Sequence, residues 1–411
     1  MKNRIVILIT GFFLLLLMGL IYAWSIFVAP LEAEFGWQRS QTSLIFTISM
    51  VFFCLGGLVS GILLKKKPSV FILISGGICL LAGFLGASRV QTLPAIMVCY
   101  GVFCGFGVGL NYNCVLSTVA RWFPDRTGMC SGVLMMGFGF GSMVLGTAAS
   151  AMISSIGWRS TFVTIGVVMA AVEVLCTFLI RLPEKADVAA YAAGAAGKKR
   201  IVEGGEYDFG GMVRLSAFWL YFIWALIFSA VGLAVIGHAA PMAREAAVAD
   251  SFIATCVGLV SISGGLARIL LGAGFDLFGR RKLMLVIDAS YLLGFLALIP
   301  AIGSKNSALL IVGFLLIGFA YGGVPTMSSA YAASMFGLKN YPVNFSTINL
   351  AIIPAALVGP AIAGNLQVQS GSYSGAIPIL IVLTVISAAA GFLIRAPKKG
   401  AAETAAPGTQ A

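Results

Sequence analysis

Three ionisable side chains lie within long apolar stretches of the sequence: Glu173, Arg268 and Asp288. A charged group at the centre of a membrane-spanning helix costs about 2.5–3.5 kcal/mol, so each of them requires a partner or a function. Arg268 lies eight residues before Asp276, where we expect its helix to end, and a rise of about 1.5 Å per residue places it about 12 Å from that end. Because a guanidinium can form two parallel hydrogen bonds with a carboxylate, Arg268 is the candidate residue for binding an organic anion. The alternative is a structural ion pair with an acid on another helix.

The other ionisable residues of the apolar stretches have less specific signals. We expect Glu173 to be a packed or protonated acid, and Asp288 to pair with the basic run Arg280–Lys282. His238 is the only histidine and lies near the end of an apolar stretch. Because histidine changes charge near neutral pH, His238 is a candidate for proton coupling, and the alternative is a hydrogen-bonded packing residue.

The composition indicates that lipid surrounds these residues. Of 411 residues, 60% are hydrophobic and only 10% are charged, with a mean hydropathy of +1.02. Soluble domains carry about 25% charged residues, so the composition excludes a soluble, disordered, coiled-coil or disulfide-stapled protein. A helical span needs about 20 apolar residues, and the chain has room for roughly twelve. The apolar stretches predict spans at about 5–29, 41–64, 70–88, 93–120, 128–153, 158–181, 216–240, 251–273, 283–303, 307–333, 341–369 and 373–395.

The distribution of lysine and arginine predicts the orientation of these spans. Of 26 such residues, twenty fall in segments on the side of the N-terminus, five on the other side, and Arg268 within a span. The positive-inside rule therefore predicts a multi-pass protein of the cell (inner) membrane with both termini cytoplasmic. The net charge of +12 is explained by this topology, so we expect no nucleic-acid partner.

One long interior loop divides the predicted spans into two sets. We predict an N-terminal six-helix bundle at 1–181, a cytoplasmic central loop at 182–215, a C-terminal six-helix bundle at 216–395 and a cytoplasmic tail at 396–411.

The sequence has no HExxH or GxSxG motif, no nucleotide-binding cassette and no paired cysteine spacing. We therefore expect no enzyme activity, no cofactor and no metal site, and a monomer suffices physically.

The loop after the eighth predicted span has a weaker counterpart 215 residues earlier, which suggests a duplicated six-helix unit. The two segments read Gly272-xxx-Asp276-xx-Gly279-Arg280-Arg281-Lys282 and Gly57-xxx-Gly61-xx-Leu64-Lys65-Lys66-Lys67. This loop, with twelve spans and two halves, resembles the major facilitator superfamily. The resemblance implies an all-α integral membrane fold of twelve transmembrane helices in two six-helix halves. It also implies that Asp276, Arg280 and Arg281 form a conformational latch, and simple positive-inside anchoring is the alternative.

Other segments resemble the oxalate/formate antiporter family and related bacterial monocarboxylate transporters. They are ARWFPDRTGMCSG at 120–132, His238-Ala-Ala-Pro241 followed by Arg268, and Asn340-Tyr-Pro-Val-Asn344-Phe. The resemblance implies a central cavity in which His238 is the polar residue and aromatic residues contact the substrate. The matching aromatic positions are Tyr22, Tyr112, Phe138 and Tyr321, and the candidate hydrogen-bonding side chains are Asn349, Asn111 and Asn113.

Two departures from these families bear on substrate and coupling. The oxalate antiporter has a lysine that partners the arginine, and Ile352 stands at that position here. With one fixed cation, a monocarboxylate such as lactate, pyruvate or formate is favoured over oxalate, because an undercompensated charge is costly. Mammalian monocarboxylate transporters have an aspartate where this chain has Gly264, so their proton-relay acid is missing. We expect Gly264 and Gly265 to leave open volume beside Arg268.

These observations predict a secondary active transporter of small monocarboxylates that works by alternating access. The substrate would be a small organic anion, protons are a candidate coupling ion, and membrane lipid surrounds the protein. Symport, antiport and uniport remain open. The alternatives are an oxalate/formate-type dicarboxylate–monocarboxylate antiporter and, more remotely, a membrane sensor or channel.

Overall fold

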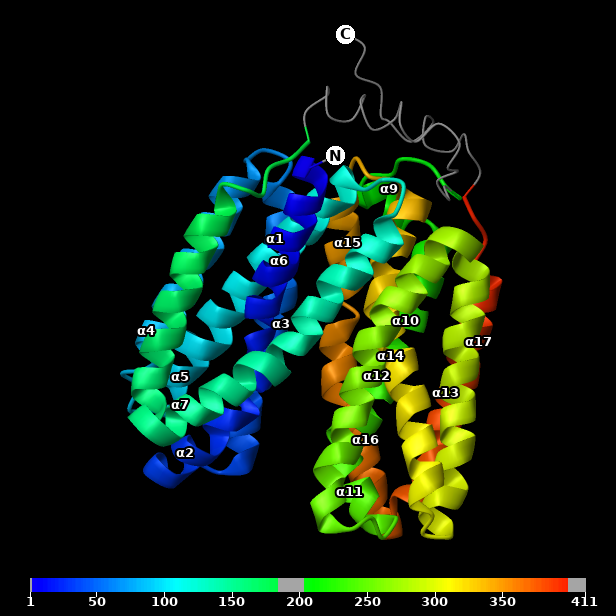
Figure 1. The fold of residues 1–411 in the computed structure, drawn as a ribbon. Coiled ribbons are helices and arrows are strands. Elements are labelled where there is room, and N and C mark those ends of the chain that lie inside the picture. Colours follow the sequence, from blue (N-terminus) through cyan, green and yellow to red (C-terminus); the bar gives the residue numbers. More distant parts are fainter. Residues whose placement is uncertain (1, 184–202, 398–411) are drawn as a thin grey trace. The chain divides into compact units, whose positions relative to one another are not determined.

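The computed structural model describes residues 2–183 and 203–397, which consist of helices and their connecting segments (Figure 1). Contacts within the chain define two compact units. Unit 1 comprises residues 1–125 and 133–199, and unit 2 comprises residues 126–132 and 200–411. The predicted central loop at 182–215 and tail at 396–411 lie largely outside the described residues, although the short helix α9 (Phe209–Val213) belongs to the loop's end.

The described helices account for twelve membrane crossings. Eleven helices are long and apolar enough to span a bilayer, and one of them, α7 (Thr127–Thr177), has 51 residues. At 1.5 Å per residue this length is about twice what a single crossing needs. Gly157 interrupts α7 with φ 76° and ψ 162°, a backbone conformation that favours glycine, and so divides it into two crossings. The all-α, twelve-span prediction is confirmed.

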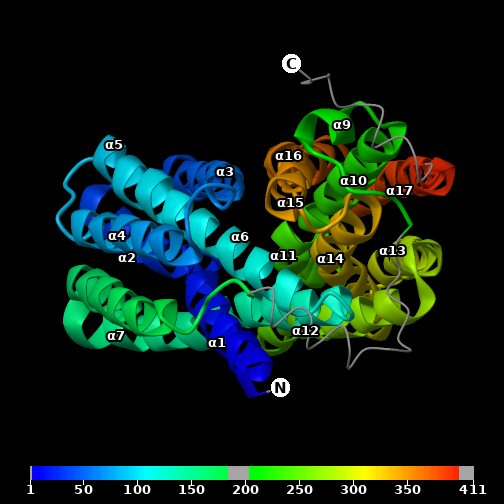
Figure 2. The same cartoon turned by 90° about the horizontal axis from the view of Figure 1, so that it is seen from above.

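Unit 1 is built around α6, which packs against α1, α3 and α4 (Figure 2). Glycines permit the close approach of α3 and α6: a Cβ added at Gly105 would lie 2.5 Å from the carbonyl oxygen of Ser49, and one at Gly109 would overlap that of Phe53. These glycines are therefore close-packing positions of the two helices. The elements of unit 1 other than α7 are α1 (Lys2–Met18), η1 (Gly19–Ala23), α2 (Ser25–Phe35), α3 (Arg39–Leu63), α4 (Ser69–Ala87), α5 (Leu93–Ile96), the π-helical η2 (Met97–Cys104) and α6 (Gly105–Trp122).

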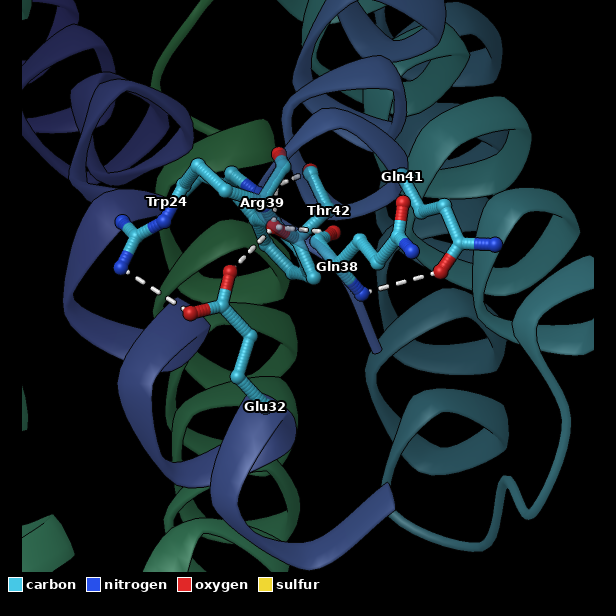
Figure 3. Close-up of polar contacts among 6 residues, drawn as sticks. All are labelled: Trp24, Glu32, Gln38, Arg39, Gln41 and Thr42. Carbon is cyan, nitrogen blue, oxygen red and sulfur yellow. Dashed lines mark hydrogen bonds and ion pairs between the residues drawn. The ribbon is translucent and has the colours of Figure 1, made fainter. Parts of the chain in front are cut away.

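A polar network fixes the turn between α2 and α3 (Figure 3). Glu32 of α2 accepts a hydrogen bond from Thr42 at 2.7 Å and forms a salt bridge with Arg39 at 3.0 Å. Trp24 donates its indole N–H to the carbonyl of Thr42 at 2.9 Å. Gln38 and Gln41 cap the start of α3 reciprocally. Trp24 therefore serves the packing of this turn.

In unit 2, α14 packs against α12 and α13, and α10 packs against α16 and α17. The break between α15 and α16 divides one membrane crossing at Leu350 and Ala351. The elements are α9, α10 (Ser216–Gly237), α11 (Ala239–Glu245), α12 (Asp250–Phe278), α13 (Arg280–Gly303), α14 (Ser307–Phe336), α15 (Tyr341–Asn349), α16 (Ile352–Ser370), η3 (Tyr373–Gly375) and α17 (Ile377–Leu393), with the first turns of α7.

Candidate functional site

Arg268 lies well inside α12, ten residues from the end of the helix at Phe278, or about 15 Å along its axis. Its side chain is half-buried, and its Nε is fully buried. The guanidinium is close enough to the phenol of Tyr321 on α14 for the two to interact electrostatically. The structure therefore brings together two of the residues predicted to bind substrate.

The space at Gly264, near Arg268, is smaller than the sequence predicted. A Cβ added at Gly264 would lie 3.1 Å from the carbonyl oxygen of Gly318, and one at Gly322 would overlap the backbone of Gly264. The backbone of α14 thus fills the space at Gly264, one of the two glycines where the sequence predicted open volume. Gly264 serves the close crossing of α12 and α14, the helices that carry Arg268 and Tyr321.

Tyr321 is packed from its other side by α10 and α13. A Cβ added at Gly232 of α10 would overlap the ring of Tyr321 and lie 2.5 Å from the hydroxyl of Tyr291. Tyr291 donates that hydroxyl to the carbonyl of Phe228 at 2.8 Å. Helices α10, α12, α13 and α14 therefore fix the position of Tyr321.

Asn349 and Ile352 flank the helix break of the eleventh crossing at nearly the depth of Arg268. Counted from the start of α15 at Tyr341, Asn349 is about 12 Å and Ile352 about 17 Å along the helix, while Arg268 is about 15 Å from the same end of unit 2. Asn349 is 8% exposed. Ile352 is thus an apolar residue at nearly the level of Arg268 along the helices of unit 2.

His238 lies near the opposite end of unit 2. It follows the 22 residues of α10 and is therefore about 33 Å from the start of that helix. Its Nδ1 donates a hydrogen bond to the carbonyl of Ala234 at 2.9 Å, because a carbonyl oxygen can only accept. The ring packs against Tyr373 at 5.5 Å, and its Nε2 faces Gly364 of α16. The structure does not bring His238 to the level of Arg268.

Three predicted aromatic residues meet in unit 1. The ring of Phe138 on α7 is 5.2 Å from that of Tyr22 and 4.8 Å from that of Tyr112. Phe53 of α3 completes the group, 5.1 Å from Tyr112 and 5.8 Å from Phe138. We call Tyr22, Phe53, Tyr112 and Phe138 the aromatic cluster. The sequence analysis did not include Phe53 among the candidate residues. Phe53 lies one turn before Gly57, and the carbonyl of Gly57 accepts a hydrogen bond from α6.

The predicted latch residue Asp276 caps the start of α7 within unit 2. Its two carboxylate oxygens accept the backbone N–H groups of Gly128 at 3.0 Å and Met129 at 2.8 Å. Helices α7 and α12 cross closely here, because added Cβ atoms at Gly128 and Gly272 would each overlap the other's carbonyl. The start of a helix has N–H groups without intrahelical acceptors and a partial positive charge, so a carboxylate is favoured there.

The basic residues of the motif have contacts of their own. Gly279 has φ 78° and ψ 172° between α12 and α13, and this turn places Arg280 in the interior. Arg280 is 2% exposed; its Nε donates to Glu203 at 3.0 Å and its terminal nitrogen donates to the carbonyl of Ile394 at 3.4 Å. Arg281 is exposed. Asp276 and Arg280 thus have different hydrogen-bond partners in this structure, and the conformational latch stays a prediction.

The acidic residues Asp288 and Glu173 of other spans also accept hydrogen bonds. Asp288 does not pair with the basic run as expected: it accepts the indole N–H of Trp224 on α10 at 3.0 Å and is 9% exposed. Asp288 lies on the core-facing side of α13 with Met284 and Tyr291, whereas Arg281 and Lys282 are exposed. Glu173 is buried in unit 1 and accepts a hydrogen bond from Asn111, a pairing that the sequence did not reveal.

Comparison with known proteins agrees with this architecture. A profile of the Major Facilitator Superfamily matches residues 7–351 and 222–410. The oxalate:formate antiporter of Oxalobacter formigenes is 27% identical over 353 residues, 84% of this chain and 82% of that protein. Monocarboxylate transporter 1 of Homo sapiens is 29% identical over 142 residues, 34% of this chain and 28% of that protein. The solved structure of the proton:xylose symporter XylE bound to 6-bromo-6-deoxy-D-glucose has a TM-score of 0.70 at 14% identity, over 96% of both chains. This multi-pass membrane protein belongs to the Major Facilitator Superfamily of transporters.

Proposed function

We propose that this transporter is a secondary active carrier of small monocarboxylates, in which Arg268 binds the carboxylate. The observation that carries the proposal is a half-buried guanidinium about 15 Å inside α12, within electrostatic range of the phenol of Tyr321. A guanidinium away from bulk water favours a carboxylate that can accept two hydrogen bonds. The names of two relatives, an oxalate:formate antiporter and a monocarboxylate transporter, support the same class of substrate.

The charge near Arg268 favours a monoanion. Ile352 contributes an apolar side chain at the depth of Arg268, where the oxalate/formate resemblance leads us to expect a lysine. One carboxylate balances one guanidinium, whereas a dicarboxylate would bring a second negative charge into a region of low dielectric constant. The second candidate is exchange of a dicarboxylate for a monocarboxylate, which the relation to the oxalate:formate antiporter favours.

Other predicted residues, taken within each unit separately, offer surfaces that suit the body of such a substrate. Tyr22, Tyr112 and Phe138 supply aromatic surface in unit 1, and Asn349 supplies an amide at the helix break of unit 2. Aromatic faces suit a short organic chain, and an amide can orient its polar substituent. We include His238 only as a candidate for proton coupling at the far end of α10.

Counterflow in proteoliposomes tests this proposal directly. We expect saturable uptake of lactate, pyruvate or formate, with oxalate a poor competitor. Arg268→Ala should abolish uptake, and Arg268→Lys should lower it by roughly 10- to 100-fold, because losing a bidentate charged hydrogen bond costs about 1.5–3 kcal/mol. Arg39→Lys is the matched control, since Arg39 forms an exposed salt bridge in the α2–α3 turn. Wild-type rates in both Arg268 variants would refute the carboxylate role, and non-saturating flux would indicate a channel.

We further propose that the protein resides in a bacterial inner membrane with both termini cytoplasmic. The excess of lysine and arginine in the segments on the side of the N-terminus supports this orientation. Reporter fusions at the two termini test it: reporters active only in the cytoplasm should be active at both ends. Activity of periplasmic reporters at either end would overturn the orientation.

A further inference from the structure

Glu173 of α7 and Asn111 of α6 form a buried polar pair in unit 1. Each is 1% exposed, and the Asn111 Nδ2 donates a hydrogen bond to Oε1 of Glu173. Two adjacent glycines of α4 make room for the pair. A Cβ added at Gly76 would overlap the amide of Asn111, and one at Gly77 would lie 2.7 Å from Oε2 of Glu173. Three helices thus enclose one carboxyl group and one amide.

Two oxygens of this pair are buried without a donor. Within the described ranges of the chain, neither Oε2 of Glu173 nor Oδ1 of Asn111 has a hydrogen-bond partner. Oδ1 of Asn111 lies against Gly76 and Oε2 of Glu173 lies against Gly77, two adjacent glycines of α4. Two acceptor oxygens cannot satisfy each other unless one of them carries a hydrogen. A proton on Oε2 would supply that hydrogen and make the acid O–H a donor for Oδ1 of Asn111, beside the hydrogen bond that Nδ2 donates to Oε1.

The groups around the pair favour the neutral acid. Glu173 interacts electrostatically with Cys79 on α4, Cys114 on α6 and Cys176 on its own helix, all of them thiols. From α1, the sulfur of Met18 lies 4.0 Å from the Asn111 Nδ2. The charge of Arg121 acts on Cys114, farther along α6. A carboxylate among these groups would be desolvated with a single amide donor, a costly arrangement that protonation relieves.

We propose that Glu173 and Asn111 form a proton-binding site in unit 1. A proton taken from water binds Oε2 of Glu173 and makes the acid O–H a donor for Oδ1 of Asn111, and its release leaves a carboxylate and removes that donor. The packing of α4, α6 and α7 around this pair therefore depends on its protonation. We also assign the proton coupling of the carrier to Glu173 in place of His238, and this second step rests on the proposed transport function.

Infrared spectroscopy of the purified protein tests the proton site without transport. A protonated carboxyl group has a C=O stretching band distinct from that of a carboxylate. We expect this band at neutral pH in the wild type, its loss in Glu173→Gln, and its retention in Asp288→Asn, the matched control for the other buried acid. Asn111→Ala keeps the acid but removes its partner, so the band should shift. A wild-type spectrum without an acid band that Glu173→Gln removes would overturn the proposal.

Transport measurements then test the coupling. Glu173→Gln mimics the protonated pair, because its amide can donate to Oδ1 of Asn111, but it cannot release a proton. We expect the variant to lose the stimulation of net uptake by an inward proton gradient while it retains exchange. Retained stimulation together with loss of the infrared band would overturn the coupling and leave the proton site standing. Failure of the wild type to carry any carboxylate would overturn the proposed function but not the infrared result.

Discussion

The carboxylate of Asp276 accepts hydrogen bonds from two backbone N–H groups at the start of α7. The free-energy cost of removing this carboxylate can therefore be estimated. The first intrahelical hydrogen bond of α7 joins the N–H of Cys130 to the carbonyl of Arg126, so the N–H groups of Gly128 and Met129 precede it. Their acceptors are the oxygens of Asp276, at 3.0 and 2.8 Å. Asp276 therefore acts as the N-terminal cap of α7 from a different helix.

We predict that Asp276→Asn weakens this capping by about 2 kcal/mol. Asparagine has one acceptor oxygen in place of two and no charge, a helix cap contributes about 0.5–2 kcal/mol, and a hydrogen bond to a charged group contributes about 1.5–3 kcal/mol. At about 1.4 kcal/mol per tenfold change, local opening becomes roughly 30-fold more frequent. Asp276→Ala removes both acceptors and should have a larger effect.

Hydrogen exchange of the Gly128 and Met129 amides is the direct assay. The matched control is Asp288→Asn, which alters a buried aspartate of the neighbouring helix α13 that accepts from Trp224. This control should leave both amides at wild-type exchange rates. Exchange of Gly128 and Met129 that stays within roughly threefold of wild type in Asp276→Ala, a free-energy change below about 0.7 kcal/mol, would refute the capping role.

Three further predictions follow from single side chains. Ile352→Lys should raise the potency of oxalate as a competitor relative to lactate, because it adds a second cation at the depth of the proposed carboxylate site; unchanged relative potency in counterflow would contradict the charge argument. Gly322→Ala should destabilise the protein by about 1–3 kcal/mol in thermal unfolding, because its Cβ would overlap the backbone of α12. Gly258→Ala, with open space around it, should be neutral or stabilising by up to about 1 kcal/mol, and equal melting temperatures of the two variants would contradict this. Trp224→Phe should cost about 1–3 kcal/mol, because Asp288 loses its indole donor, and an unchanged melting temperature would show that this bond contributes little.

The crossing helices could be predicted from apolar length, because each must satisfy its own backbone hydrogen bonds in lipid. The predicted span 307–333 corresponds to α14 (Ser307–Phe336). The interruptions could not be predicted. The predicted span 5–29 is broken at η1 (Gly19–Ala23), which contains no proline. Gly19 packs so tightly against the backbone of Phe138 and Gly141 that the local geometry follows from this contact, which only the folded chain reveals.

The candidate site likewise combines a residue that could be predicted from the sequence with contacts that could not. Arg268 could be found because a charge deep within an apolar stretch stands out in the sequence. The partner of Glu173 could not be found, because Asn111 lies 62 residues away and the signal of their pairing is two ordinary glycines on a third helix. Asp288 was assigned to the nearest basic residues in sequence, yet its position on α13 turns it towards Trp224 on α10. Sequence proximity was a poor guide because helical rotation decides which side chains meet.

The proposed proton site at Glu173 and the proposed carboxylate site at Arg268 together predict which loaded states carry no net charge, with the charges of the other ionisable groups held constant. With Arg268 charged, Glu173 ionised and no substrate, the two groups sum to zero. With one monocarboxylate bound and Glu173 protonated, they again sum to zero. A carrier loaded with the anion alone is negative, and one loaded with the proton alone is positive. Because a net charge within the bilayer is costly, we expect both partly loaded forms to be disfavoured during reorientation, so that anion and proton would move together.

The same sum of charges distinguishes a monocarboxylate substrate from a dicarboxylate substrate. A dicarboxylate bound with one proton leaves a net charge of minus one, which a second cation would have to balance, and Ile352 does not supply it. In Glu173→Gln the empty carrier is positive and the carrier loaded with a monocarboxylate is neutral, so its empty return is disfavoured while exchange of one anion for another persists. On the two proposals together, we expect proton-coupled net uptake and anion exchange to differ by the protonation of Glu173, and the expected preference for monocarboxylates rests on the charge of Arg268.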